Sequence, residues 1–174
     1  MAEAANSPGT LPGDAELLAA LERAVDEVFT SMICTFESLA EHAQAQTGSA
    51  GGTRSTFDRE AVVEFRGAIS GQVVFRCTAD GAHDIARGLL MLDDETTLAV
   101  DEINDALKEC ANMVTGHMKT RVLDPLGRYD LSVPFMKDVG TEVPGPACGA
   151  LVYRLQQGWV SVELWRRDAS SHSA

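Results

Sequence analysis

Residues 100–122 read VDEINDALKECANMVTGHMKTRV, and this stretch decides the expected fold. An α-helix turns by about 100° per residue, so residues three and four apart fall on the same side of it. The side expected to face a core contains Val100, Ile103, Leu107, Cys110, Ala111, Val114 and Met118. The spacing therefore predicts one amphipathic helix over about residues 98–123, which Pro125 prevents from continuing.

Polar and small residues share the opposite side of this helix, within a sector of about 80°. We name this set the ridge: Glu102, Asp105, Glu109, Asn112 and Gly116. Rows of acidic residues on a helix usually form only a solvated face. Asparagine is unfavourable inside a helix, however, and a mid-helix glycine costs about 1 kcal/mol relative to alanine. Violations of local rules cluster at functional sites, so these residues alone leave a solvated face and a functional site equally open.

The rest of the chain predicts helices and strands in an order typical of an α+β protein. Apolar spacing predicts helices over residues 15–41 and 81–92, and β-type segments lie within 56–78, 129–136, 150–155 and 159–165. The expected order is helix, two strands, helix, long helix and three strands. Helices covering one face of a sheet of sequence neighbours make an α+β sandwich.

The length of 174 residues is most simply one domain. Residues 1–13 are rich in Ala, Gly, Pro and Ser and predict a disordered tail, and residues 168–174 form a second expected tail. The Gly-, Ser- and Thr-rich stretch 43–56 has no apolar stripe and predicts an internal loop. We therefore expect a single domain over residues 14–167.

Composition excludes several classes of function. The 14 basic and 26 acidic residues give a net charge of −12, which argues against nucleic acid and anionic membrane surfaces. No stretch approaches the roughly 20 apolar residues of a membrane helix. The first residues lack a basic and an apolar segment, so we expect no secretory signal and a cytoplasmic protein. The four cysteines have no CxxC spacing, so we expect structural thiols and no metal site.

The string DALKECANMVTGHMK, residues 105–119, resembles the signature helix of the CheX branch of the CheC/CheX/FliY chemotaxis phosphatases. The matching positions are Asp105-Ala106, Glu109, Asn112-Met113, Gly116 and Lys119. Neighbouring segments agree in order, through Gly71, Val73, Phe75, Ile85, Ala86, Leu89, Leu131, Ser132, Pro134 and Gly140. The resemblance covers about residues 57–166, and more loosely the first helix.

This resemblance implies both a fold and an activity. The fold is CheC/CheX-like, a mostly antiparallel sheet with two long helices packed on one face. The activity is removal of phosphate from the aspartyl phosphate of a CheY-like response regulator in chemotaxis or two-component signalling. Glu109 would pair with the regulator's lysine, and the Asn112 amide would orient the attacking water. We expect further partner contacts at Glu102, Asp105, Met113 and Gly116.

The chemistry of these side chains suits the implied roles. An amide oxygen accepts a hydrogen bond from water without adding charge beside a phosphoryl group. A carboxylate suits an ammonium partner. Phosphoryl transfer depends mainly on positioning and on charge stabilisation. The regulator would supply Mg²⁺ and a lysine, so we expect no metal or cofactor on this chain.

The chain carries one E-x-x-N site, because Glu27 is followed three residues later by Thr30. A single site resembles CheX, whose members are typically homodimers, so we expect a homodimer. The stretch 140–148, with Pro144 and Pro146, could alter a dimer contact near the sheet edge. Two alternatives remain: a non-catalytic module of the same fold that binds response regulators or dimerises, and an unrelated structural domain.

Overall fold

The computed structural model describes residues 11–32, 36–43, 57–93 and 95–167. Residues 1–10 of the expected N-terminal tail, residues 44–56 of the expected internal loop and the expected tail 168–174 lie outside the described residues. The helices are α1 (Asp14–Met32), α2 (Ala79–Leu90) and α3 (Val100–Met118), followed by a π-helical turn, η1 (Lys119–Leu123), and a 3₁₀ turn, η2 (Asp124–Leu126). The strands are β1 (Glu37–Ala43), β2 (Arg59–Arg66), β3 (Ser70–Cys77), β4 (Asp130–Leu131), β5 (Phe135–Lys137), β6 (Ala147–Arg154) and β7 (Trp159–Arg167).

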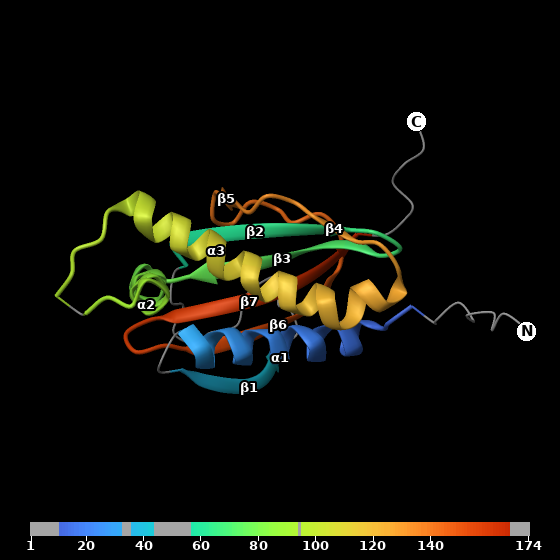
Figure 1. The fold of residues 1–174 in the computed structure, drawn as a ribbon, viewed down its shortest axis with the longest axis horizontal. Helices are drawn as coiled ribbons and strands as arrows, with labels where there is room; N and C mark the ends of the chain where they lie inside the picture. The colour runs from blue at the N-terminus through green and yellow to red at the C-terminus, as the bar shows by residue number, and fades with distance from the viewer. Residues whose placement is uncertain (1–10, 33–35, 44–56, 94, 168–174) are drawn as a thin grey trace, which may run out of the picture.

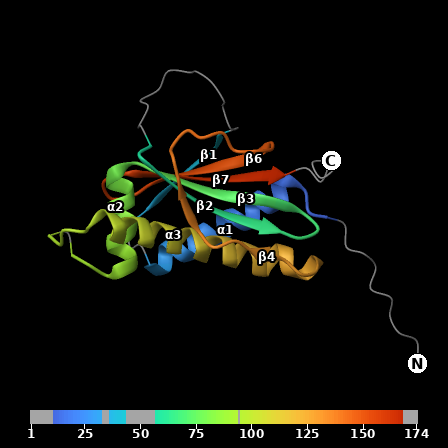
Figure 2. The same cartoon turned by 90° about the horizontal axis from the view of Figure 1, so that it is seen from above.

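The strands form one antiparallel sheet with the order β1-β6-β7-β3-β2-β4, and β5 also pairs with β2. Helices α1 and α3 lie side by side across one face of this sheet, as Figures 1 and 2 show from two directions. The predicted fold class, with two long helices on one face of a mostly antiparallel sheet, is confirmed.

The apolar stripe of α3 packs on the sheet. Ile103, Leu107, Cys110, Val114 and Met118 are each at most 2% exposed. They belong to one core with inward side chains of the sheet and of α1, including Ala61, Val63, Phe65, Val73, Phe75, Val25 and Val28. Each fully buried side chain of this size contributes about 1.5–3 kcal/mol relative to its exposed state. This packing fixes the rotation of α3 about its own axis, so the ridge must face outward.

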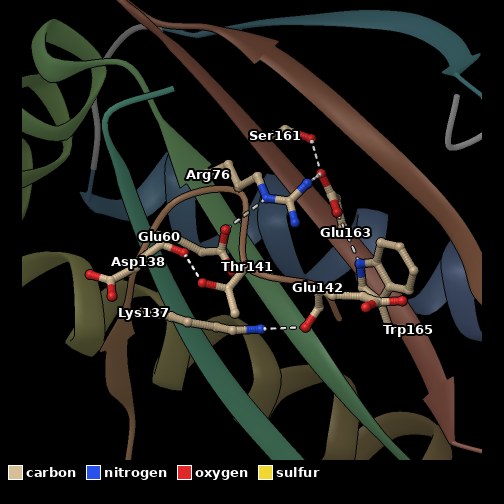
Figure 3. A network of polar contacts seen from close by, with 9 residues as sticks. All are labelled: Glu60, Arg76, Lys137, Asp138, Thr141, Glu142, Ser161, Glu163 and Trp165. Carbon is tan, nitrogen blue, oxygen red and sulfur yellow. Dashed lines mark hydrogen bonds and ion pairs between the residues drawn. The ribbon is translucent and has the colours of Figure 1, made fainter. Parts of the chain in front are cut away.

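A polar network occupies the other face of the sheet (Figure 3). Arg76 donates from Nε to Glu60 and from Nη1 to Glu163, each at 2.9 Å. Glu60 is fully buried and Glu163 is 8% exposed, and burial raises the pKa of the Glu163 carboxyl. One guanidinium thus compensates two buried carboxylates, which would otherwise be costly to remove from water.

Residues 138–146, which we name the strap, cross this second face of the sheet. Val143 is 7% exposed and packs with Val62, Val74 and Trp165. The strap is held at its middle and at its C-terminal end, because Lys137 Nζ donates to the Glu142 carbonyl at 3.0 Å and the Arg166 N–H donates to the Pro146 carbonyl at 3.0 Å. The unusual stretch 140–148 therefore covers a face of the sheet, in addition to leading into β6.

The predicted first helix, residues 15–41, is wrong at its C-terminal end. Helix α1 is described to Met32, and Glu37–Ala43 forms strand β1 instead. This strand pairs with β6, with Glu37 opposite Arg154 and Ser38 opposite Tyr153. Phe36 packs edge-on against Phe29, with ring centroids 5.5 Å apart. Pairing with a distant strand thus prevails over a helical spacing that Phe36 and Leu39 only appeared to continue.

Smaller differences concern the helix ends. Val100 is 56% exposed, so it does not belong to the buried stripe in which it was predicted. Leu92 lies beyond α2, because Met91 takes a left-handed conformation that ends the helix. Helical turns continue to Leu126, since Pro125 sits in the first turn of η2, where no N–H is needed.

The predicted strand over residues 129–136 divides into β4 and β5, with Pro134 between them at the sheet edge.

Candidate functional site

The central pair of the ridge, Glu109 and Asn112, projects from consecutive turns of α3. Glu109 is exposed and Asn112 is partly exposed. Within the part of the chain that the structure describes, neither side chain takes part in a hydrogen bond or an ion pair. The helix that carries them is buried along its opposite side, so both groups are held on a rigid element. A carboxylate and an amide are thus placed side by side and left available to another molecule.

The two other acidic residues of the ridge already have partners within the chain. Glu102 Oε2 accepts a hydrogen bond from the Ala99 N–H at 2.7 Å and thereby caps the N-terminus of α3. Asp105 pairs with Lys108 Nζ at 2.7 Å, one helical turn away. Both are exposed, so they can still contribute charge to a contact surface, but their carboxylates have local structural roles that Glu109 and Asn112 lack.

Gly116 continues the ridge towards the C-terminal end of α3. A Cβ atom at this position would meet no other atom within 4 Å. The fold therefore does not require a glycine here, although glycine weakens the helix. Met113, by contrast, is partly buried and packs against the core, so only part of its side chain is available to a partner.

A contact between the long helices connects α1 to the end of α3. Glu27 of α1 binds His117 Nδ1 at 3.2 Å and also pairs with Arg121. Hydrogen bonds from Arg121 and His117 lower the pKa of the Glu27 carboxyl. His117 is exposed, and its partner Glu27 lies on the other long helix. Glu27, in the part of α1 that lacks an asparagine, is thus engaged in holding the two helices together.

The thiols near the site fit a structural role. Cys110, which follows Glu109 in the chain, is fully buried, and burial raises the pKa of its thiol to about 12. Cys77 is also buried, and its pKa is likewise raised. Both are therefore protonated and behave as small apolar side chains. Among the described residues, no group of three or more Asp, Glu, His or Cys could hold a metal ion.

The sequence and the fold were compared with those of known proteins. The sequence matches the family model described as "Chemotaxis phosphatase CheX" over residues 60–143, which run from the second residue of β2 to beyond β5 and contain the whole of α3. None of the curated proteins matches the sequence at a significant level. No helix in the described residues is long and apolar enough to cross a membrane.

Solved structures share the fold over most of the chain. CheX from Vibrio vulnificus is 17% identical with a TM-score of 0.67, over 90% of this chain and 99% of its own. CheX from Borrelia burgdorferi, in a complex with CheY, BeF3 and Mg²⁺, is 16% identical with a TM-score of 0.66, over 87% and 98%. CheX from Desulfovibrio desulfuricans is 16% identical with a TM-score of 0.64, over 87% and 99%.

The fold defined by this sheet and these helices is the CheC/CheX-like class. The family match over residues 60–143 and the shared fold confirm the resemblance to CheX-type chemotaxis phosphatases that was found in the sequence. At these identities the structural likeness shows the fold, and the roles of individual residues stay predictions.

Sequence reasoning missed two features around the site. The Glu27 contact joins residues about ninety positions apart, which no local pattern predicts. The predicted helix over residues 81–92 also gave no sign that Leu90, Met91 and Leu92 are all exposed.

We predict that Gly116→Ala raises the free energy of unfolding by about 1 kcal/mol, because alanine favours the helix and finds open space. Chemical denaturation measures this change. Gly81→Ala is the matched control in α2, since its Cβ would lie 2.4 Å from the Trp159 carbonyl oxygen and should destabilise the protein. A loss of stability in Gly116→Ala would show instead that the fold itself requires this glycine.

Proposed function

We propose that this protein hydrolyses the aspartyl phosphate of a CheY-like response regulator. In this proposal Asn112 positions the attacking water and Glu109 pairs with the regulator's active-site lysine. One observation carries the proposal: an amide and a carboxylate stand on adjacent turns of a rigid helix, and neither has a partner among the described residues. The CheX family match and the CheX complex with CheY support the choice of substrate.

In the proposed reaction this chain contributes mainly the positioning of the attacking water. The water oxygen forms a bond to phosphorus, the bond from phosphorus to the aspartate oxygen breaks, and the aspartate leaves as a carboxylate. The water proton passes to the phosphate product or to solvent. The Asn112 amide oxygen would accept a hydrogen bond from the water and hold it in line with the bond that breaks. Mg²⁺ belongs to the regulator as part of the substrate.

Replacement of Asn112 by alanine should lower kcat for phosphate release by about 100-fold or more, because the water loses its orientation. The affinity for the regulator should change by less than about twofold. Phosphate release from a regulator phosphorylated with a small-molecule donor measures the rate. Asn104→Ala is the matched control on the same helix, since the Asn104 amide already accepts a hydrogen bond from Arg59 at 3.0 Å.

Full turnover in Asn112→Ala would refute the role of this amide. Binding of the regulator by the wild-type protein without any acceleration of phosphate release would instead support a non-catalytic module that binds response regulators.

Glu109→Gln should raise the Kd for the regulator about tenfold, because it removes one charge from a charge-assisted pair at nearly constant shape. The affinity of the variant should also depend less on salt. Titration at two ionic strengths measures both effects. Glu16→Gln, which removes the same charge from the exposed start of α1, should leave both unchanged. Equal affinity and salt dependence in Glu109→Gln and the wild type would remove Glu109 from the site.

We also propose a cytoplasmic homodimer of single-domain chains with boundaries near residues 14 and 167. The CheX resemblance supports this state, and so does the outer edge of the sheet, where Val133 is 84% exposed and Phe135 is 40% exposed. Sedimentation equilibrium should give twice the chain mass of 18.6 kDa. A mass of one chain at micromolar concentration would contradict the dimer.

A further inference from the structure

Exposed apolar side chains gather where α2 leads into α3. Eight large apolar side chains are exposed in the described residues, and four of them lie between residues 90 and 100. We name these four the α2–α3 patch: Leu90 (46% exposed), Met91 (84%), Leu92 (37%) and Val100 (56%). Exposed apolar groups that cluster in this way mark contact surfaces, whereas isolated ones are ordinary.

Besides its exposure, Met91 has an unfavourable backbone conformation. It has a φ of 55° and is the one residue other than glycine with a positive φ among the described residues. Its N–H and that of Leu92 close the end of α2 on the Arg87 and Gly88 carbonyls. Glycine or asparagine would fit this left-handed cap at lower cost. Neither helix capping nor core packing therefore accounts for a methionine that points into solvent.

The C-terminal end of α2 lies on the outer side of the molecule that the ridge faces, whereas Val100 lies at the start of α3 on the side of that helix opposite the ridge. Helix α2 begins at the sheet, where the Thr78 N–H donates to the Trp159 carbonyl and Thr78 Oγ1 accepts from the Trp159 N–H. It then runs away from the sheet, as Figure 2 shows, for about 18 Å over its 12 residues. Its last residues thus reach the outer level of α3, and the chain returns from there to Val100, two residues before Glu102 of the ridge.

The charge around the patch defines the kind of partner. Residues 87–109 contain seven acidic side chains against two basic ones, Arg87 and Lys108. A second copy of this chain would bring like charges together on this surface, which costs free energy. A partner that presents apolar groups bordered by basic side chains is complementary to it. Such a partner fits the proposed pairing of Glu109 with a lysine, because both place positive charge opposite the same side of α3.

We propose that the α2–α3 patch is a docking surface for the CheY-like regulator and receives apolar and basic groups that lie beside its active-site lysine. The proposal rests on the proposed function. The patch would determine affinity and the choice among regulators, whereas Asn112 would determine the rate of the chemical step.

The test compares Met91→Asn with Val139→Asn for binding of a CheY-like regulator loaded with BeF3 and Mg²⁺. Asparagine retains the left-handed conformation at residue 91 and removes the apolar side chain. We expect the Kd to rise about tenfold in Met91→Asn. Val139 is the control, since it is also an exposed apolar side chain, at 42%, but lies in the strap on the other face of the sheet. Its substitution should leave the Kd unchanged.

An unchanged Kd in Met91→Asn, or an equal loss in both variants, would overturn the docking surface. A lower solution mass of Met91→Asn than of the wild type would also overturn it, because the patch would then contact a second copy. Binding to the BeF3-loaded regulator requires no turnover. A wild-type protein that binds but releases no phosphate would therefore refute the phosphatase and leave the test of the patch intact.

Discussion

The burial of one side of α3 against the sheet is the constraint on which the rest of the structure depends. Ile103, Leu107, Cys110 and Val114 fill the space between the helix and the strands with almost no exposed area. A rotation of α3 by even a quarter of a turn would expose this stripe and bury carboxylates. The outward direction of Glu109 and Asn112 is therefore a consequence of core packing, and it needs no interaction made by those two side chains themselves.

The two faces of the sheet are packed in different ways. The helix face is apolar and supplies a rigid base for the site. The other face carries Glu60, Arg76 and Glu163, and the strap covers its apolar part through Val143. Helices need not cover this second face, so α1 and α3 can both lie on the first. This arrangement leaves the outer side of α3 and the end of α2 as neighbouring surfaces without a covering element among the described residues.

Much of this could be predicted from the sequence, because the helix that carries the site is strongly periodic. The buried stripe, the outward ridge and the hairpins β2–β3 and β6–β7 all follow from local spacing. Strand β1 could not be predicted, since its formation depends on pairing with β6, more than a hundred residues away. The exposure of Met91 was also missed, because helical spacing cannot show where a left-handed residue ends a helix. Local patterns thus predicted which side of α3 faces outward, and non-local contacts determined its surroundings.

In the proposed complex, Glu109 and Asn112 face the phosphorylated centre of a response regulator. A crystal structure of this protein with a CheY-like regulator, BeF3 and Mg²⁺ tests it most directly. We expect the Asn112 amide to face the BeF3 group with room for one water between them. We expect the Glu109 carboxylate within about 4 Å of the regulator's lysine. A complex in which the ridge of α3 remains in solvent while another surface contacts the regulator would contradict the roles proposed for Glu109 and Asn112.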